Sequence, residues 1–159
     1  MEQQVDRVVP LDVGVVADPG VSGAVLLRDD HRTYLTFRSC ARSVTEGAGP
    51  TAIVTFERCL ITKFGYPNDE ALDGHPLSAR GLAAYGVFEV LDSSWARSVV
   101  IQNRVRFPAT PDDYAGRHFV FAFHDSTFEC LARDLRVEFA EGPAAEIIQR
   151  LAATLDGGD

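Results

Sequence analysis

The sequence predicts an α+β fold, with a mostly antiparallel curved sheet in the form of a sandwich or partial barrel. Most of the chain consists of short stretches rich in β-branched and aromatic residues, separated by turn signals. Two segments, 93–105 in mid-chain and 142–155 at the C-terminus, have helical spacing instead. A length of 159 residues favours one globular domain over 1–159, with 155–159 as a frayed tail.

Four strands are expected in the first half of the chain. The stretches 13–17 and 21–27 are short, rich in valine and joined by an Asp-Pro-Gly turn. Residues 32–40 alternate between apolar and polar, which is typical of a half-buried strand. A loop rich in Gly and Pro then leads into 51–64, which we interpret as one long strand with a bend near Glu57–Arg58.

A long polar segment follows, at 65–84. It is rich in Gly, Pro and charged residues, so we expect a loop with a helical turn at 69–72 or 77–83. Loops of this length are uncommon in compact domains and are often functional. The strand pattern returns at 85–92.

The mid-chain helix is predicted at 93–105. Ser93 or Ser94 can cap its N-terminus, and Trp95 and Val99 fall on one face. A helix here gives the otherwise β-rich pattern its first α element.

The rest of the chain is expected to contain a loop at 107–116 and three antiparallel strands at 117–125, 127–133 and 135–140. An amphipathic helix is expected at 142–155. The apolar stripe of this helix consists of Ile147, Ile148, Leu151 and Leu155. Such a stripe suits packing on the sheet, and it also suits a homodimer interface.

Composition narrows the functional classes. Hydrophobic residues make up 46% and charged residues 24%, as in an ordinary soluble domain, and the net charge of −8 argues against nucleic-acid binding. No apolar stretch is long enough for a membrane span, and the N-terminus lacks a signal-peptide pattern, so a cytoplasmic protein is expected. Cys40, Cys59 and Cys130 have no CxxC spacing and are expected to be free thiols. The chain is arginine-rich with Lys63 as its only lysine, which is typical of a GC-rich bacterial genome.

The loop after the fourth strand is the first candidate site. Within eight positions it holds Asn68, Asp69, Glu70, Asp73 and His75. Acid–base chemistry needs titratable groups that lie close together in different environments, and this loop could supply them. The alternative is that the Asn-Asp and Gly-His-Pro steps are plain turns.

The second candidate site is the segment "FAFHDSTFEC" at 121–130. By alternation, Phe119, Phe121 and Phe123 point to one face of the strand and His124 points to the other. After the turn, Phe128 should join the phenylalanine layer, and Glu129 should share the face of His124, perhaps as its cross-strand neighbour. A histidine beside a carboxylate can act as an oriented general base. The alternative is a polar hairpin turn, with His124 and Glu129 as a solvated pair beside Asp125 and Ser126.

We predict no metal site and no organic cofactor. A site with two histidines and one carboxylate would suit iron or zinc, but the chain has no HxH, HxD or HExxH spacing. The GxSxG, P-loop and GxGxxG fingerprints are also absent. Tyr66 and Tyr114 lie in the two long loops and are expected to line a pocket mouth, with ordinary packing as the alternative.

Together, the residues predict a small cofactor-independent cytoplasmic enzyme that uses histidine and carboxylate acid–base chemistry on a compact substrate. The expected catalytic residues are His124, His75, Glu129, Asp125 and Glu70, and the expected substrate-binding residues are Tyr66, Asn68, Asp69 and Tyr114. Isomerase, cyclase, lyase and hydrolase reactions all remain open. The alternatives are a binding or interaction module without catalysis, and a purely structural domain.

Overall fold

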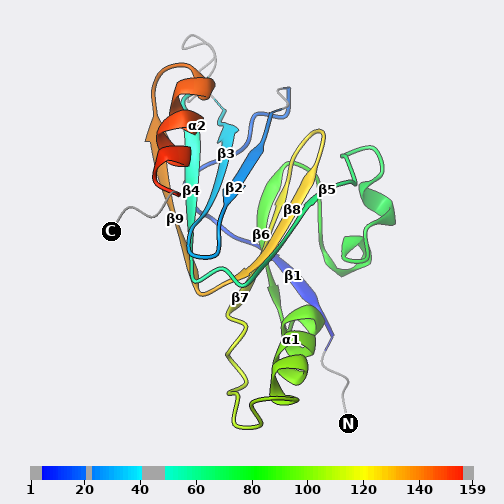
Figure 1. Cartoon of the computed structure of the whole chain (residues 1–159). Coiled ribbons are helices and arrows are strands. Elements are labelled where there is room, and N and C mark those ends of the chain that lie inside the picture. Colours follow the sequence, from blue (N-terminus) through cyan, green and yellow to red (C-terminus); the bar gives the residue numbers. More distant parts are fainter. Residues whose placement is uncertain (1–4, 21–22, 41–48, 156–159) are drawn as a thin grey trace.

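The computed structural model describes residues 5–20, 23–40 and 49–155, and these fold into two antiparallel sheets that face each other (Figure 1). The first sheet contains, in spatial order, β1 (Arg7–Pro10), β6 (Gly86–Leu91), β7 (Arg117–Ala122), β8 (Thr127–Ala132) and β5 (Ile61–Gly65). The second contains β2 (Val25–Arg28), β3 (Thr33–Arg38), β4 (Thr51–Glu57) and β9 (Asp134–Ala140). The predicted mostly antiparallel α+β fold is therefore confirmed, in the form of two sheets and without a closed barrel among these residues.

The main core fills the space between the two sheets. Alternation along β7 and β8 directs Phe119, Phe121 and Phe128 into this core, where they meet Phe56 of β4. The predicted phenylalanine layer, with Phe128 as its continuation, is confirmed. Of the three free cysteines, only Cys130 is buried.

The outer face of the first sheet is covered by two different segments. One end lies under α1 (Ser94–Arg104), whose Val100 packs on Leu131. The other end lies under the polar segment, which contains two short 3₁₀ helices, η1 (Leu72–Gly74) and η2 (Ser78–Arg80). Its leucines pack on the sheet together with Val120; they are Leu72, Leu77 and Leu82. The site lies where these two covering segments meet.

Gly81 shows how closely the covering segment approaches the sheet. Its φ of +116° lies in the left-handed region, and a Cβ on it would lie 2.7 Å from the carbonyl oxygen of Val8 in β1. Only glycine meets both requirements without strain.

Two strand predictions in the first half were wrong. Residues 51–64 form β4 and β5 in different sheets, because Arg58 has a left-handed backbone with φ of 49° and redirects the chain there. The predicted bend is therefore correct, but it separates two strands. Residues 13–17 form no strand and contribute only a bridge between Ala17 and Ser39, whereas β1 was not predicted. The predicted strand at 21–27 corresponds to β2, and residues 21–22 lie outside the described residues.

The C-terminal helix α2 (Ala144–Ala153) lies beside β9 on the outer side of the second sheet (Figure 1). Ile147 of the predicted stripe is fully buried there, and Thr154 contacts the hydroxyl of Tyr34 at 3.0 Å. The predicted tail lies outside the described residues from position 156 onwards.

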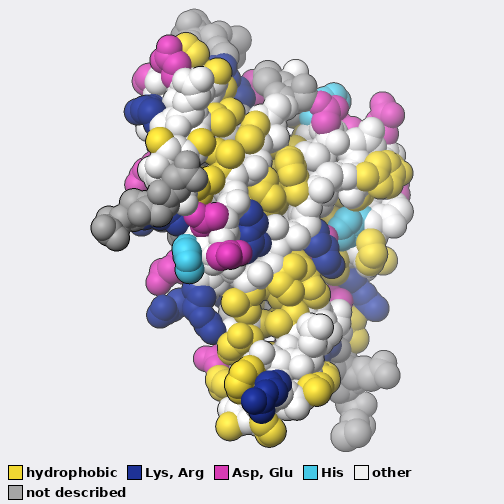
Figure 2. All heavy atoms as spheres, viewed as in Figure 1, with side chains coloured by type: hydrophobic (Ala, Val, Ile, Leu, Met, Phe, Trp, Pro, Cys, Tyr) yellow, Lys and Arg dark blue, Asp and Glu magenta, His cyan; other side chains and the backbone are white. Residues whose placement is uncertain are grey.

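Apolar side chains are exposed around α1, at the end of the molecule away from α2 (Figure 2). Ile101, Val105 and Phe107 are 65%, 87% and 60% exposed. This surface adjoins one of the two cavities described below.

Candidate functional site

A cavity of about 480 Å³ lies between α1 and the polar segment, over the outer face of the first sheet. Glu129 and His118 come from strands β8 and β7, and His75 comes from the covering loop. The rest of the lining includes Asp6, Lys63, Tyr66, Pro67, Leu77, Ser94 and Trp95. This space, called the sheet cavity below, is large enough for a compact ligand.

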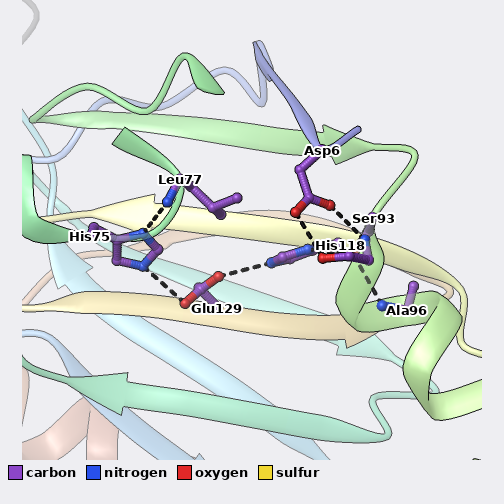
Figure 3. A network of polar contacts seen from close by, with 8 residues as sticks. Asp6, His75, Leu77, Ser93, Ala96, His118 and Glu129 are labelled. Carbon is purple, nitrogen blue, oxygen red and sulfur yellow. Dashed lines mark hydrogen bonds and ion pairs between the residues drawn. The ribbon is translucent and has the colours of Figure 1, made fainter. Parts of the chain in front are cut away.

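Glu129 is the centre of the polar network in this cavity (Figure 3). Its Oε2 lies 3.1 Å from Nε2 of His75, and its Oε1 lies 2.9 Å from Nε2 of His118. Burial alone would raise the pKa of Glu129, but the hydrogen bonds from His118 and His75 outweigh burial and lower the pKa to about 2. The carboxylate is therefore ionised at neutral pH.

The hydrogen bonds of His75 fix its proton. Its Nδ1 accepts the backbone N–H of Leu77 at 3.0 Å, so this nitrogen must carry a lone pair. The proton of the neutral ring therefore lies on Nε2, where it is donated to Glu129. A second proton on Nδ1 would face the N–H of Leu77, and the hydrogen bond from Leu77 would be lost.

His118 differs from His75 because its other neighbour is a hydroxyl. Nδ1 of His118 lies 2.8 Å from Oγ of Ser93. Ser93 also caps α1 by accepting the N–H of Ala96 at 3.1 Å. A hydroxyl can either donate or accept, so His118 can be neutral or protonated without losing a hydrogen bond. Of the two histidines on Glu129, only His118 therefore has a second partner that can either donate or accept.

The strand register explains how these residues come together. Glu129 lies directly opposite Val120 on β7 and opposite Lys63 on β5, so His118 is its diagonal neighbour on the same face. The ammonium of Lys63 lies 3.9 Å from the centre of the Trp95 ring. Asp6 lies at the start of α1, where it accepts the N–H of Ser94 at 2.5 Å and its hydroxyl at 2.8 Å.

A second histidine–carboxylate group lies nearer the surface. Asp69 accepts hydrogen bonds from the hydroxyl of Tyr85 and from Nδ1 of His124, the latter at 2.8 Å. The hydrogen bonds from Tyr85 and His124 lower the pKa of Asp69, and the bond to Asp69 raises the pKa of His124. The side chain of His124 is 43% exposed. We call Asp69, Tyr85 and His124 the surface cluster, and His75, His118 and Glu129 the buried cluster.

The polar loop and the 124–129 hairpin meet in the structure. The N–H of Asp69 donates to the carbonyl of His124 at 3.0 Å, and the hydroxyl of Thr127 donates to the carbonyl of Pro67 at 2.9 Å. The expectation that His124 is the cross-strand neighbour of Glu129 was wrong, because Val120 holds that position and His124 lies beyond the end of β7. The histidines of Glu129 are His75 and His118 instead.

The other predicted site residues have different positions. Tyr66 lines the sheet cavity and is 85% exposed. Asn68 accepts the N–H of Ala71 at 3.1 Å and so orders the loop. Glu70 and Asp125 have exposed side chains, and Asp125 lies 3.8 Å from Nε2 of His124. Tyr114 packs beside α1 under the guanidinium of Arg58, outside the lining of the sheet cavity.

Several site residues were not among the predicted ones. His118 lies on the same face of the first sheet as Glu129, so the alternation that placed Glu129 could have identified it. Ser93 was expected only as a helix cap, and Lys63, Trp95 and Asp6 have no local signal that connects them. Their approach depends on the fold.

The geometry of His75 also bears on metal binding. A neutral histidine that binds a metal through Nε2 carries its proton on Nδ1, where His75 faces the N–H donor of Leu77. Among the residues that the structure describes, no group of three or more His, Cys, Asp or Glu side chains is arranged to hold a metal ion.

Comparisons with family models, curated proteins and solved structures gave no match to this chain. In the part of the chain that the structure covers, neither α1 nor α2 nor any shorter helix has the length and hydropathy of a membrane span.

Proposed function

We propose that this protein is a small cofactor-independent enzyme that hydrolyses a compact acyl ester. In this proposal Ser93 is the nucleophile, His118 is the general base and acid, and Glu129 is the positioning residue that stabilises His118. The observation that carries the proposal is the chain of two hydrogen bonds, of 2.8 Å and 2.9 Å, from Ser93 through His118 to Glu129. The proposal narrows the histidine and carboxylate chemistry expected from the sequence to one reaction, the hydrolysis of an ester.

The direction of proton transfer follows from the hydrogen bonds. Because Nε2 of His118 is engaged with Glu129, the nitrogen that can accept a proton is Nδ1, and the group facing it is the hydroxyl of Ser93. Proton transfer to His118 would create an imidazolium next to an ionised carboxylate, which favours the charged ring. The N–H of His75 keeps the other oxygen of Glu129 in place.

The reaction would proceed in two balanced steps. Oγ of Ser93 forms a bond to the carbonyl carbon while its proton moves to Nδ1 of His118, and the ester C–O bond breaks as the alcohol leaves with that proton. A water molecule then attacks the acyl–serine, giving its proton to His118, and Ser93 takes the proton back as the carboxylic acid leaves. Water is the only co-reactant.

The position of Ser93 supports a role as nucleophile. It lies between β6 and α1, directly after Asp92, whose φ of 56° turns the chain sharply. It also lines a second cavity of about 480 Å³, whose lining does not include Glu129. The other lining residues are Asp92, Ala96, Arg97, Val100, Ile101, Arg104 and Asp112. This serine cavity opens beside the exposed Ile101, so it suits an ester with a small apolar part.

Hydrolysis of p-nitrophenyl acetate tests the proposal. We expect wild-type protein to release p-nitrophenol with saturation kinetics, and S93A to lose at least 100-fold in kcat/KM. The matched control is S98A, because Ser98 lies on the exposed face of the same helix and only donates to the carbonyl of Trp95. Thermal denaturation would check that S93A is folded, since loss of the cap alone costs about 1 kcal/mol. Equal rates in S93A and S98A would contradict the proposal.

A binding module without catalysis remains the second candidate. The observation that favours it is that both nitrogens of His75 and both of His118 already have partners within the protein. Such a closed network can also serve as a rigid floor for a bound ligand. A cytoplasmic location belongs to the proposal for either candidate.

A further inference from the structure

We infer that the sheet cavity is a binding site for a compact organic cation, such as a primary amine or amidine, with Glu129 as its anionic partner. This site lies on the Glu129 side of His118 and differs from the serine cavity in which we place ester hydrolysis. The inference therefore goes beyond the proposed function and does not require it.

The cavity floor holds a buried carboxylate. Glu129 is 8% exposed, and its side-chain hydrogen bonds come from Nε2 of His75 and Nε2 of His118. A buried charge is costly unless an opposite charge meets it. Asp6 adds a second carboxylate to the lining.

The position of the only lysine in the chain also supports a ligand cation. Lys63 lies directly opposite Glu129 in the sheet register, where an ion pair would be expected. Its ammonium lies over the ring of Trp95 instead, and the ion pairs of Glu129 in the described residues involve only His75 and His118. Lys63 therefore does not neutralise Glu129.

Glu129 can also accept further hydrogen bonds. A carboxylate can accept about four hydrogen bonds, and the two histidines supply one to each oxygen. Ammonium and amidinium groups are donors without acceptors, so they suit the remaining positions.

The ring of Trp95 forms part of the cavity wall. The ring already holds the Lys63 ammonium, which shows that a cation fits on its face. Lys63 is an exposed side chain, so its stem can swing toward solvent when a ligand cation enters.

The site has a built-in reporter, because Trp95 is the only tryptophan in the chain. Its single indole N–H signal in ¹H–¹⁵N NMR can be followed during titration at constant ionic strength. We propose butylammonium chloride as the probe, with 1-butanol and sodium butyrate as neutral and anionic counterparts of similar size. Saturable binding of butylammonium, at least tenfold tighter than that of either counterpart, is the expected result. Tighter binding of butyrate would overturn the inference, because Lys63 would then define the site.

Variants test whether Glu129 is responsible for butylammonium binding. We expect E129Q to weaken butylammonium binding at least tenfold, and D112N, an exposed carboxylate in the serine cavity, to leave it unchanged. K63M serves as a second variant if E129Q is unstable, because Lys63 lies on the surface and its removal eliminates a competing cation. It should tighten binding several-fold, and unchanged or weaker binding would contradict the inference. Hydrolysis and butylammonium binding are separate measurements on the same wild-type protein, so failure of ester hydrolysis and failure of cation binding can be distinguished.

Discussion

The buried and surface clusters contain the same chemical groups but differ in what surrounds them. Both pair a carboxylate with histidine across the junction between the polar loop and the first sheet. In the buried cluster, protein atoms occupy every histidine nitrogen, so the location of each proton follows from its neighbour. In the surface cluster, water reaches His124, whose side chain is 43% exposed. Burial of the histidines, rather than residue type, therefore distinguishes the two clusters. The first cluster is a candidate site, and the second holds the loop against the hairpin.

The largest expected effect is loss of the Glu129 carboxylate. E129A would leave two buried histidine N–H groups without an acceptor, and we expect the free energy of unfolding to fall by about 3 kcal/mol. D69A removes the corresponding carboxylate of the surface cluster, whose partners His124 and Tyr85 reach solvent and can hydrogen-bond to water instead, and it should cost clearly less. Urea denaturation of both variants measures the difference. Equal losses would remove the distinction between the clusters.

Glu129 of the buried cluster and His124 of the surface cluster should also respond to pH in different ranges. The pKa of Glu129 is lowered from 4.5 to about 2, so its stabilisation is fully present above pH 4.5 and is lost as the pH falls toward 2. By linkage this stabilisation amounts to about 3 kcal/mol. The pKa of His124 is raised above 6.5, so its contribution is fully present below pH 6.5 and is lost as the pH rises through the folded-state value.

Urea denaturation of wild type, E129Q and H124Q over a pH series separates these contributions. E129Q should flatten the acidic limb of the stability curve, and H124Q should flatten the limb above pH 6.5. A persistent acidic limb in E129Q would assign that stabilisation to other carboxylates.

The smallest expected effect is that of a substitution in the surface cluster on hydrolysis and on cation binding. H124Q should leave both p-nitrophenyl acetate hydrolysis and butylammonium binding within twofold of wild type, because His124 is not among the lining residues of either cavity. Steady-state kinetics and the Trp95 titration provide the measurements. A tenfold loss of either would place His124 in the functional site and favour the assignment expected from the sequence.

Sequence patterns predicted the features that depend on residues close together in the chain, such as the face of a strand to which a side chain points. Alternation placed Phe128 in the core and Glu129 on the opposite face, and it also directs His118 to that face. The partner of Glu129 could not be derived in this way, because strand register and loop placement decide which histidine approaches it. The 51–64 segment was misread for a related reason, since the left-handed turn at Arg58 moves the chain to another sheet without changing its apolar pattern.

Ser93 illustrates the same limit. Its position before a helical pattern predicted a cap, and the hydrogen bond from Ala96 confirms that role. Its second bond, to His118, joins residues 25 positions apart and depends on β6, β7 and α1 being packed together. A residue whose position is explained by the local sequence can therefore have a second role that is visible only in the folded structure.

The central claim, that Ser93 is activated by His118 and Glu129, is tested most directly by covalent labelling with an alkyl fluorophosphonate and peptide mass spectrometry. The account predicts one phosphonyl group on Ser93 of the wild type, formed with release of fluoride, and at least tenfold slower labelling in E129Q. S98A should be labelled at the wild-type rate. Absence of label on Ser93 in folded wild-type protein, or equal labelling rates in wild type and E129Q, would contradict it.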